Sequence, residues 1–101
     1  MGMANLQRMA MQMQQGIERV KGELAAARVE GSDGGGVVSA VVTGDNKLVE
    51  IKIDPSAVDP EDVEMLQDLI VAAVNDALAS AAQLAETKMA AVTGGMRLPG
   101  M

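Results

Sequence analysis

The fold is decided by the stretch VVSAVVTGDNKLVEIKIDP, residues 37–55. Residues 37–42 form a run rich in β-branched side chains, and in residues 49–53 apolar and charged side chains alternate. Both patterns are typical of β-strands. The turn-forming residues 44–46 lie between the two runs, so the stretch predicts an antiparallel β-hairpin.

The segment before the hairpin predicts one more strand. Residues 27–31 are separated from the first run by a loop that contains Gly34, Gly35 and Gly36, and glycine permits positive φ in such a loop. A phosphate-binding loop would need Gly-Lys-Ser/Thr after its glycines, and two valines follow instead. We expect a small antiparallel sheet whose apolar face, with Ile51 and Ile53, must be covered.

After the hairpin the sequence predicts a long helix. Asp54 and Pro55 end the last strand, Asp59 is the expected N-cap, Pro60 the first helical residue, and the helix can continue to Thr93 before Gly94 and Gly95. At ~1.5 Å per residue it would be roughly 50 Å long. One apolar side would comprise Val63, Leu66, Ile70, Val71, Val74, Leu78, Leu84, Met89 and Val92, and another Met65, Leu69, Ala72 and Ala79.

A helix that is apolar on two sides requires two partners. One side can cover the sheet of its own chain, and a twofold homodimer is the simplest way to cover the other. Residues 6–27 predict a second amphipathic helix with a stripe that begins Leu6, Met9, Met13. The candidate dimer-interface residues are Met65, Leu69, Ala72, Met9 and Met13.

Length and composition restrict the function. The 101 residues suffice for one domain, residues 1–101, whose tail from about 95 to 101 is expected to be mobile. The chain has no His, Cys, Phe, Trp or Tyr, which removes imidazole and thiolate metal sites and most nucleophilic machinery. We therefore expect no catalytic residue, no cofactor, no metal and no enzymatic activity. No membrane-spanning segment or signal peptide is expected, which indicates a cytoplasmic protein.

One acidic cluster leaves two interpretations open. Asp59, Glu61, Asp62 and Glu64 could supply oxygen ligands to Mg²⁺ or Ca²⁺. Their expected position in the first helical turn already explains them, because acidic side chains are favourable there, and we prefer this interpretation.

The charge is acidic overall but unevenly distributed. Eight basic and fourteen acidic residues give a net charge of −6, yet residues 1–28 hold four basic and two acidic residues. A dimer would present this local positive charge twice and could contact DNA phosphates without reading bases. The candidate DNA-binding residues are Arg8, Arg19, Lys21, Arg28 and Lys88.

The ordered segments resemble the YbaB/EbfC family of bacterial nucleoid-associated proteins. The matching segments are MQMQQ at 11–15, GGGVV at 34–38, VEIKIDPS at 49–56, LIVAAVNDA at 69–77 and KMAAVTGGMRLPGM at 88–101. The resemblance implies an α+β fold with an α-β-β-β-α protomer, and a homodimer shaped like tweezers. It also implies a nucleoid protein that binds duplex DNA and alters its conformation.

Two functions therefore remain as hypotheses. The first is the DNA-binding nucleoid protein, with possible roles in nucleoid organisation, gene regulation and DNA protection. The second is an acidic dimeric module with little DNA affinity that binds a protein partner in recombination or replication. The net charge of −6 favours the second hypothesis, and the family resemblance favours the first.

Overall fold

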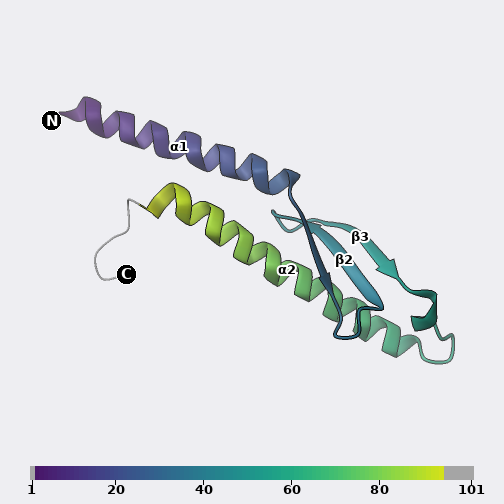
Figure 1. The fold of residues 1–101 in the computed structure, drawn as a ribbon. Coiled ribbons are helices and arrows are strands. Elements are labelled where there is room, and N and C mark those ends of the chain that lie inside the picture. The colour runs from purple at the N-terminus through teal and green to yellow at the C-terminus, as the bar shows by residue number, and fades with distance from the viewer. Residues whose placement is uncertain (1, 95–101) are drawn as a thin grey trace.

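The structure, a computed structural model, describes residues 2–94, so the tail expected at 95–101 lies outside the described residues. The elements follow the predicted α-β-β-β-α order, with a short 3₁₀ helix after the third strand (Figure 1). In chain order they are α1 (Met3–Ala26), β1 (Arg28–Ser32), β2 (Val38–Thr43), β3 (Leu48–Ile53), η1 (Pro55–Ala57) and α2 (Val63–Thr93).

The three strands form an antiparallel sheet in the order β1-β2-β3. Both the hairpin and the additional strand before it are confirmed. In the hairpin turn, Asn46 adopts a left-handed conformation (φ 72°), and the Thr43 hydroxyl accepts a hydrogen bond of 2.9 Å from the Lys47 amide. A β-bulge between β2 and β3 places Glu50 opposite Val41 and Leu48 opposite Val42, so that Val49 is skipped.

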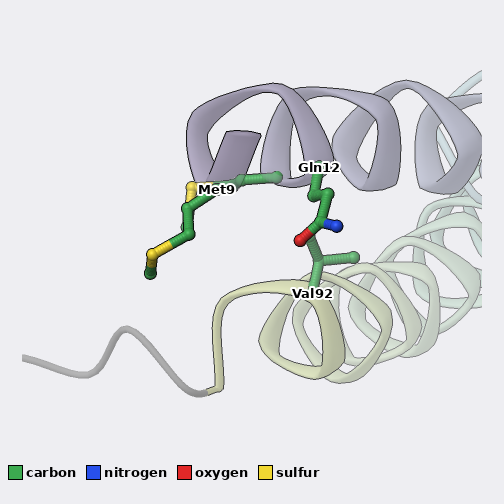
Figure 2. Close-up of a pocket in the computed structure, with 4 residues that line it drawn as sticks. Met9, Gln12 and Val92 are labelled. Carbon is green, nitrogen blue, oxygen red and sulfur yellow. The ribbon is translucent and has the colours of Figure 1, made fainter. Parts of the chain in front are cut away.

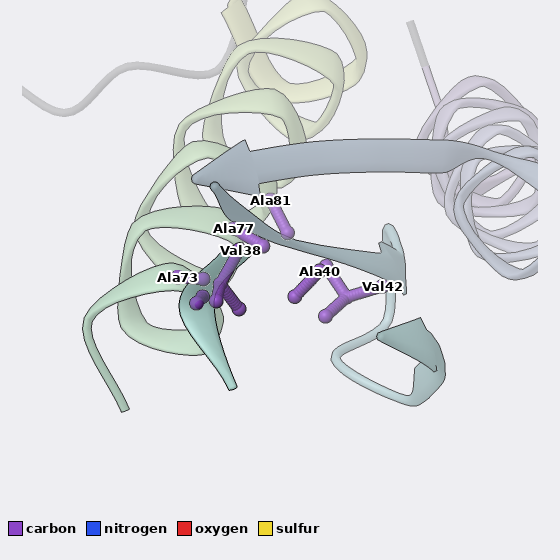
Figure 3. Packing of buried hydrophobic residues seen from close by; sticks show 7 residues of the cluster. Val38, Ala40, Val42, Ala73, Ala77 and Ala81 are labelled. Carbon is purple, nitrogen blue, oxygen red and sulfur yellow. The ribbon is translucent and has the colours of Figure 1, made fainter. Parts of the chain in front are cut away.

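The core lies between β2 and α2. Alternate residues of β2, namely Val38, Ala40 and Val42, point to α2 and are fully buried. The facing residues of α2 are Ala73, Ala77 and Ala81, which are spaced by four and therefore share one helix face (Figure 3). Because these three side chains are small, the helix axis can lie close to the sheet.

The row of Ala73, Ala77 and Ala81, called the alanine stripe below, shows that the predicted division of α2 into two apolar sides is partly wrong. Leu69, expected on the second side, packs against the same core cluster as Leu66 and Ile70. Val63 and Val71, expected on the covered side, are exposed. The reason is that the alanines occupy the centre of the contact, so larger side chains on both flanks of the stripe reach the sheet.

The start of α2 also differs from the prediction. The N-cap is Asp62, whose carboxylate accepts a hydrogen bond of 3.1 Å from the Met65 amide, and the helix begins at Val63. Asp59 instead closes a tight turn: its carboxylate accepts from the Glu61 amide and its carbonyl from the Asp62 amide, both at 2.9 Å. The predicted end at Thr93 is confirmed.

By length and composition alone, α2 would suffice to cross a membrane, which differs from the expectation above. Its place in the fold argues for a core helix, because it packs along β1 and β2. Asp76, within its most apolar part, accepts a hydrogen bond of 3.0 Å from the Ser32 amide of β1. This hydrogen bond between Asp76 and β1 fixes the position of α2 along the sheet.

The loop before β2 is organised by the carboxylate of Asp33. It accepts hydrogen bonds from the amides of Gly35 (2.6 Å), Gly36 (2.9 Å) and Val38 (2.7 Å). Burial raises the pKa of Asp33, but these hydrogen bonds outweigh it and bring the pKa below the ordinary value of 3.8. Gly36 has a φ of +77°, which closes the loop in a conformation that favours glycine.

Candidate nucleic-acid interface

Helix α1 is attached to the rest of the domain along its C-terminal half only. Val20 and Leu24 are buried, and the Leu24 carbonyl accepts a hydrogen bond of 2.8 Å from the Gly44 amide in the hairpin turn. At Gly16 the helix crosses α2 closely, since an added Cβ would lie 2.8 Å from Cγ1 of Val92. The stretch from Met3 to Gln15 extends beyond these contacts (Figure 1).

The predicted apolar stripe of α1 is therefore covered over part of its length. Its first members, Leu6 and Met9, are exposed, while Met13 is half-buried. A small cleft between α1 and α2 is lined by Met9, Gln12, Met13 and Val92 (Figure 2). The cleft marks the place where the two helices begin to separate.

Three of the candidate DNA-binding residues already have partners in the domain. Lys21 lies 3.7 Å from the Glu18 carboxylate on α1, and Lys88 of α2 lies 3.8 Å from that of Glu23. The Arg28 guanidinium donates to the carbonyls of Ala25 (3.3 Å) and Ala27 (3.1 Å) at the end of α1. Lys21 and Lys88 each face a carboxylate of the same domain, and Arg28 serves partly as a cap of the helix.

The remaining two, Arg8 and Arg19, are exposed, and no carboxylate within residues 2–94 lies within 4.0 Å of either guanidinium. They are eleven positions apart, which is about three turns of helix, so both side chains leave α1 on the same side with about 16 Å between them along the axis. Gln12 and Gln15 occupy the intervening turns and are also exposed, and Gln12 borders the cleft with α2 as well. We call Arg8, Gln12, Gln15 and Arg19 the Arg/Gln stripe.

The two arginines are among the DNA-binding residues predicted from the sequence, and the two glutamines between them are not. The signal was present, because the spacing of four, three and four from Arg8 to Arg19 keeps all four residues on one helix face. The amide of glutamine and the guanidinium of arginine both donate hydrogen bonds to phosphate oxygens. The stripe is thus a row of donors about three helical turns long.

The candidate dimer-interface residues do not form one surface in a single copy. Met65 and Ala72 are exposed on α2, whereas Leu69 packs against the core of its own chain. Met9 and Met13 belong to α1, near its crossing with the end of α2. Their role at an interface remains a prediction.

The acidic cluster at the start of α2 serves the local backbone. Asp59 and Asp62 accept the hydrogen bonds described above, and Glu64 lies in the first helical turn. Within residues 2–94 no group of three or more acidic side chains is arranged so that it could hold a metal ion.

Comparison with known proteins gives a consistent result. Residues 1–96 match the model of the YbaB/EbfC DNA-binding family. The chain is 53% identical to a nucleoid-associated protein of Moorella thermoacetica over 99% of both chains. It is 47% identical to one of Chloroflexus aurantiacus, covering 96% of this chain and 97% of that one. A crystal structure of an uncharacterized protein from Helicobacter pylori shares the fold with a TM-score of 0.69 at 24% identity, covering 95% of this chain and 97% of that one.

Proposed function

The chain belongs to the YbaB/EbfC DNA-binding family, and from this premise we propose that it is a nucleoid-associated protein that binds duplex DNA as a homodimer and alters its conformation. The family is one of DNA-binding proteins and not of enzymes. The proposed location is the nucleoid, within the bacterial cytoplasm, as the names of the relatives suggest. The proposed roles are nucleoid organisation, gene regulation and protection of DNA.

The observation that carries this proposal is the Arg/Gln stripe on α1. Outside α1 the chain has five basic and twelve acidic residues, whereas α1 itself has three basic and two acidic ones. Both acidic residues of α1, Glu18 and Glu23, are engaged with lysines. The negative charges nearest the stripe are thus partly offset by lysines, while the guanidinium and amide groups of the stripe remain exposed donors.

Counterion release explains how an acidic protein can bind DNA. Affinity depends on the number of phosphates that meet local positive charge, and not on the charge of the whole protein. Two arginines per copy give four in a homodimer, so the slope of log affinity against log salt should be about −3 to −4. We expect micromolar, sequence-tolerant binding at low salt that weakens strongly at physiological salt.

The proposal can be tested with two variants that remove the same amount of charge. Arg8→Gln combined with Arg19→Gln removes the cations of the stripe, and Lys21→Gln combined with Lys88→Gln removes two cations that already face carboxylates. Fluorescence anisotropy of a labelled duplex at low salt should show a loss of at least tenfold in affinity for the arginine variant and a much smaller loss for the lysine variant. Equal losses would show that net charge, and not the stripe, determines binding.

The acidic protein-interaction module remains the second candidate, favoured by the net charge of −6. In this function the dimer would bind a protein of recombination or replication and have little affinity for DNA. If the unaltered protein fails to shift duplex DNA at any salt concentration while it remains folded, this second function replaces the first.

A further inference from the structure

One side of α1 carries a row of large apolar side chains that is covered at one end and exposed at the other. The row begins with Met3, Leu6, Met9 and Met13, whose spacing of three, three and four keeps them on one broad side of the helix. Met3 is 75% exposed, Leu6 66% and Met9 51%, whereas Met13 is half-buried and Val20, further along the same side, is buried. The start of the row is thus an exposed apolar surface.

Two hollows follow this row of side chains. The first is the cleft at the end of α2, with a volume of about 200 Å³, in which Met9 and Gln12 of α1 face Val92 (Figure 2). The second has a volume of about 510 Å³ and lies toward the start of α1, where its lining includes Met3, Leu6 and again Met9. Because Met9 lines both, the two hollows are adjacent. We call the row from Met3 to Met13, with the two hollows beside it, the methionine groove.

The chain leaves α2 in the direction of the methionine groove. Lys88 lies 3.8 Å from the Glu23 carboxylate, and four residues later Val92 lies against Gly16, so the two helices are antiparallel. Each step toward the end of α2 therefore leads toward the start of α1, and α1 continues beyond the end of α2 (Figure 1). The residues that follow Gly94 consequently start at the inner end of the groove.

Residues 95–101, which lie outside the described residues, have the length and the sequence that the groove requires. The groove covers ten helical positions, about 15 Å in length. Seven extended residues span roughly 23–25 Å, which is more than enough. Alternate side chains of an extended chain point to the same side, so Met96 and Leu98 would share one side. Pro99 favours an extended conformation of Leu98, the residue before it.

The border of the groove is suited to a peptide backbone. Asn5 lines one hollow and Gln12 the other, and because they are seven positions apart both lie on the same flank of the groove. Each amide can donate to a peptide carbonyl and accept from a peptide N–H. A segment tethered at Gly94 also has an effective concentration of roughly millimolar, above that of a second copy or another protein at micromolar concentration. The favoured occupant is therefore the chain itself.

We propose that residues 95–101 bind as an extended strap in the methionine groove of their own chain, with Met96 against Met9 and Leu98 against Leu6. The strap covers the exposed apolar side chains and thereby holds the first turns of α1 in helical form. It goes beyond the proposed function and does not depend on DNA. The two arginines of the Arg/Gln stripe leave α1 on the opposite side, at ~100° per residue, so the strap leaves them accessible.

The absence of cysteine in the chain allows a test by cross-linking. Leu6→Cys combined with Leu98→Cys should form an internal disulfide on mild oxidation, so that both free thiols disappear while the mass on a denaturing gel stays at 10.4 kDa. Ala4→Cys combined with Leu98→Cys is the matched control, because Ala4 is exposed on the opposite side of α1, and its disulfide should form roughly tenfold more slowly. Equal rates would overturn the proposal. A product of about 21 kDa, twice the chain mass, would place the strap on a second copy and would overturn it as well.

Hydrogen exchange tests the strap without cysteines. Leu98→Gln replaces an apolar side chain that faces the groove, and Arg97→Gln replaces its neighbour, which points away in an extended chain. Exchange of the amides of residues 5–13, followed by mass spectrometry of peptides, should be roughly tenfold faster in Leu98→Gln and unchanged in Arg97→Gln. If Leu98→Gln leaves this exchange unchanged, or if both variants raise it equally, residues 95–101 do not cover the groove.

Discussion

Gly31 of β1 lies directly against the backbone of Ala77 in α2. A Cβ atom added at Gly31 would be 2.1 Å from the Ala77 nitrogen and 2.5 Å from its Cα, which no side-chain rearrangement can relieve. The fully buried alanine at 77 and the glycine opposite it together determine how closely helix and sheet approach. The contact is thus made by two of the smallest side chains in the chain.

Gly31→Ala should consequently destabilise the protein by several kcal/mol, because the helix would have to move away from the whole sheet. Gly34→Ala is the control, since an added Cβ there has no atom within 4 Å. Thermal unfolding followed by far-ultraviolet circular dichroism at one fixed protein concentration compares them. A melting temperature that is equally affected in both variants would contradict this role of Gly31.

Two glycines of α1 provide a test of the crossing between the helices. Gly22→Ala should raise the free energy of unfolding by about 0.5–1 kcal/mol, because alanine is the better helix former and no atom lies within 4 Å of the added Cβ. Gly16→Ala has the same advantage but displaces Val92, so its gain should be cancelled or reversed. If both variants melt higher by the same amount, α1 and α2 are not in close contact at Gly16.

Asp33 should make the stability of the fold depend on pH. Its pKa is lowered in the folded protein, so the ionised carboxylate stabilises the fold fully above about pH 5, and this contribution is lost as the pH falls through the folded pKa, below 3.8. Asp33→Asn removes this titration. Urea unfolding should show a large difference between the two proteins at pH 7 and a smaller one near pH 3. A difference that does not change with pH would contradict this role.

The start of α2 can be tested by its two aspartates. Asp62→Ala removes the N-cap and should cost about 1 kcal/mol of stability. Asp59→Ala removes only a hydrogen bond within the preceding turn and should cost less. If chemical denaturation showed a larger loss of stability for Asp59→Ala than for Asp62→Ala, the N-cap would be Asp59, as the sequence predicts.

Most of the fold follows from local sequence. The alternation in β3, the turn at residues 44–46 and the apolar periodicity of both helices each depend on neighbouring residues. The strand, the turn and the two helices that these patterns predict are confirmed, whereas the assignment of side chains to two sides of α2 was wrong. The N-cap was misplaced because Asp59-Pro60 and Asp62 are both acceptable helix starts, and only the turn between them decides. The alanine stripe at Ala73, Ala77 and Ala81 was not predicted, because alanine is only weakly hydrophobic and the larger apolar residues determine the hydrophobic pattern of the helix.

The candidate site was less predictable than the fold, because it depends on contacts between residues that are far apart in the sequence. The pair of Glu18 and Lys21 could be read from its spacing of three, but the pair of Glu23 and Lys88 joins two helices that are far apart in the sequence. Sequence alone could not show that β3 remains uncovered, because its alternating pattern is the same whether the cover comes from its own chain or from another.

The N-terminal half of α1, which projects from the crossing with α2, would act mechanically as a lever if the helix rotated at that crossing. Its pivot is the crossing at Gly16 and Val92, and its free length is about 20 Å from Met3 to Gln15. A rotation of about 10° at the pivot would displace the tip by roughly 3–4 Å over that length, a sizeable fraction of the ~6 Å width of the DNA minor groove. The homodimer of the proposed function would carry two such segments. Their separation could then adapt to the local width of a duplex while each Arg/Gln stripe stays straight, and this adaptation would allow binding without a preferred sequence.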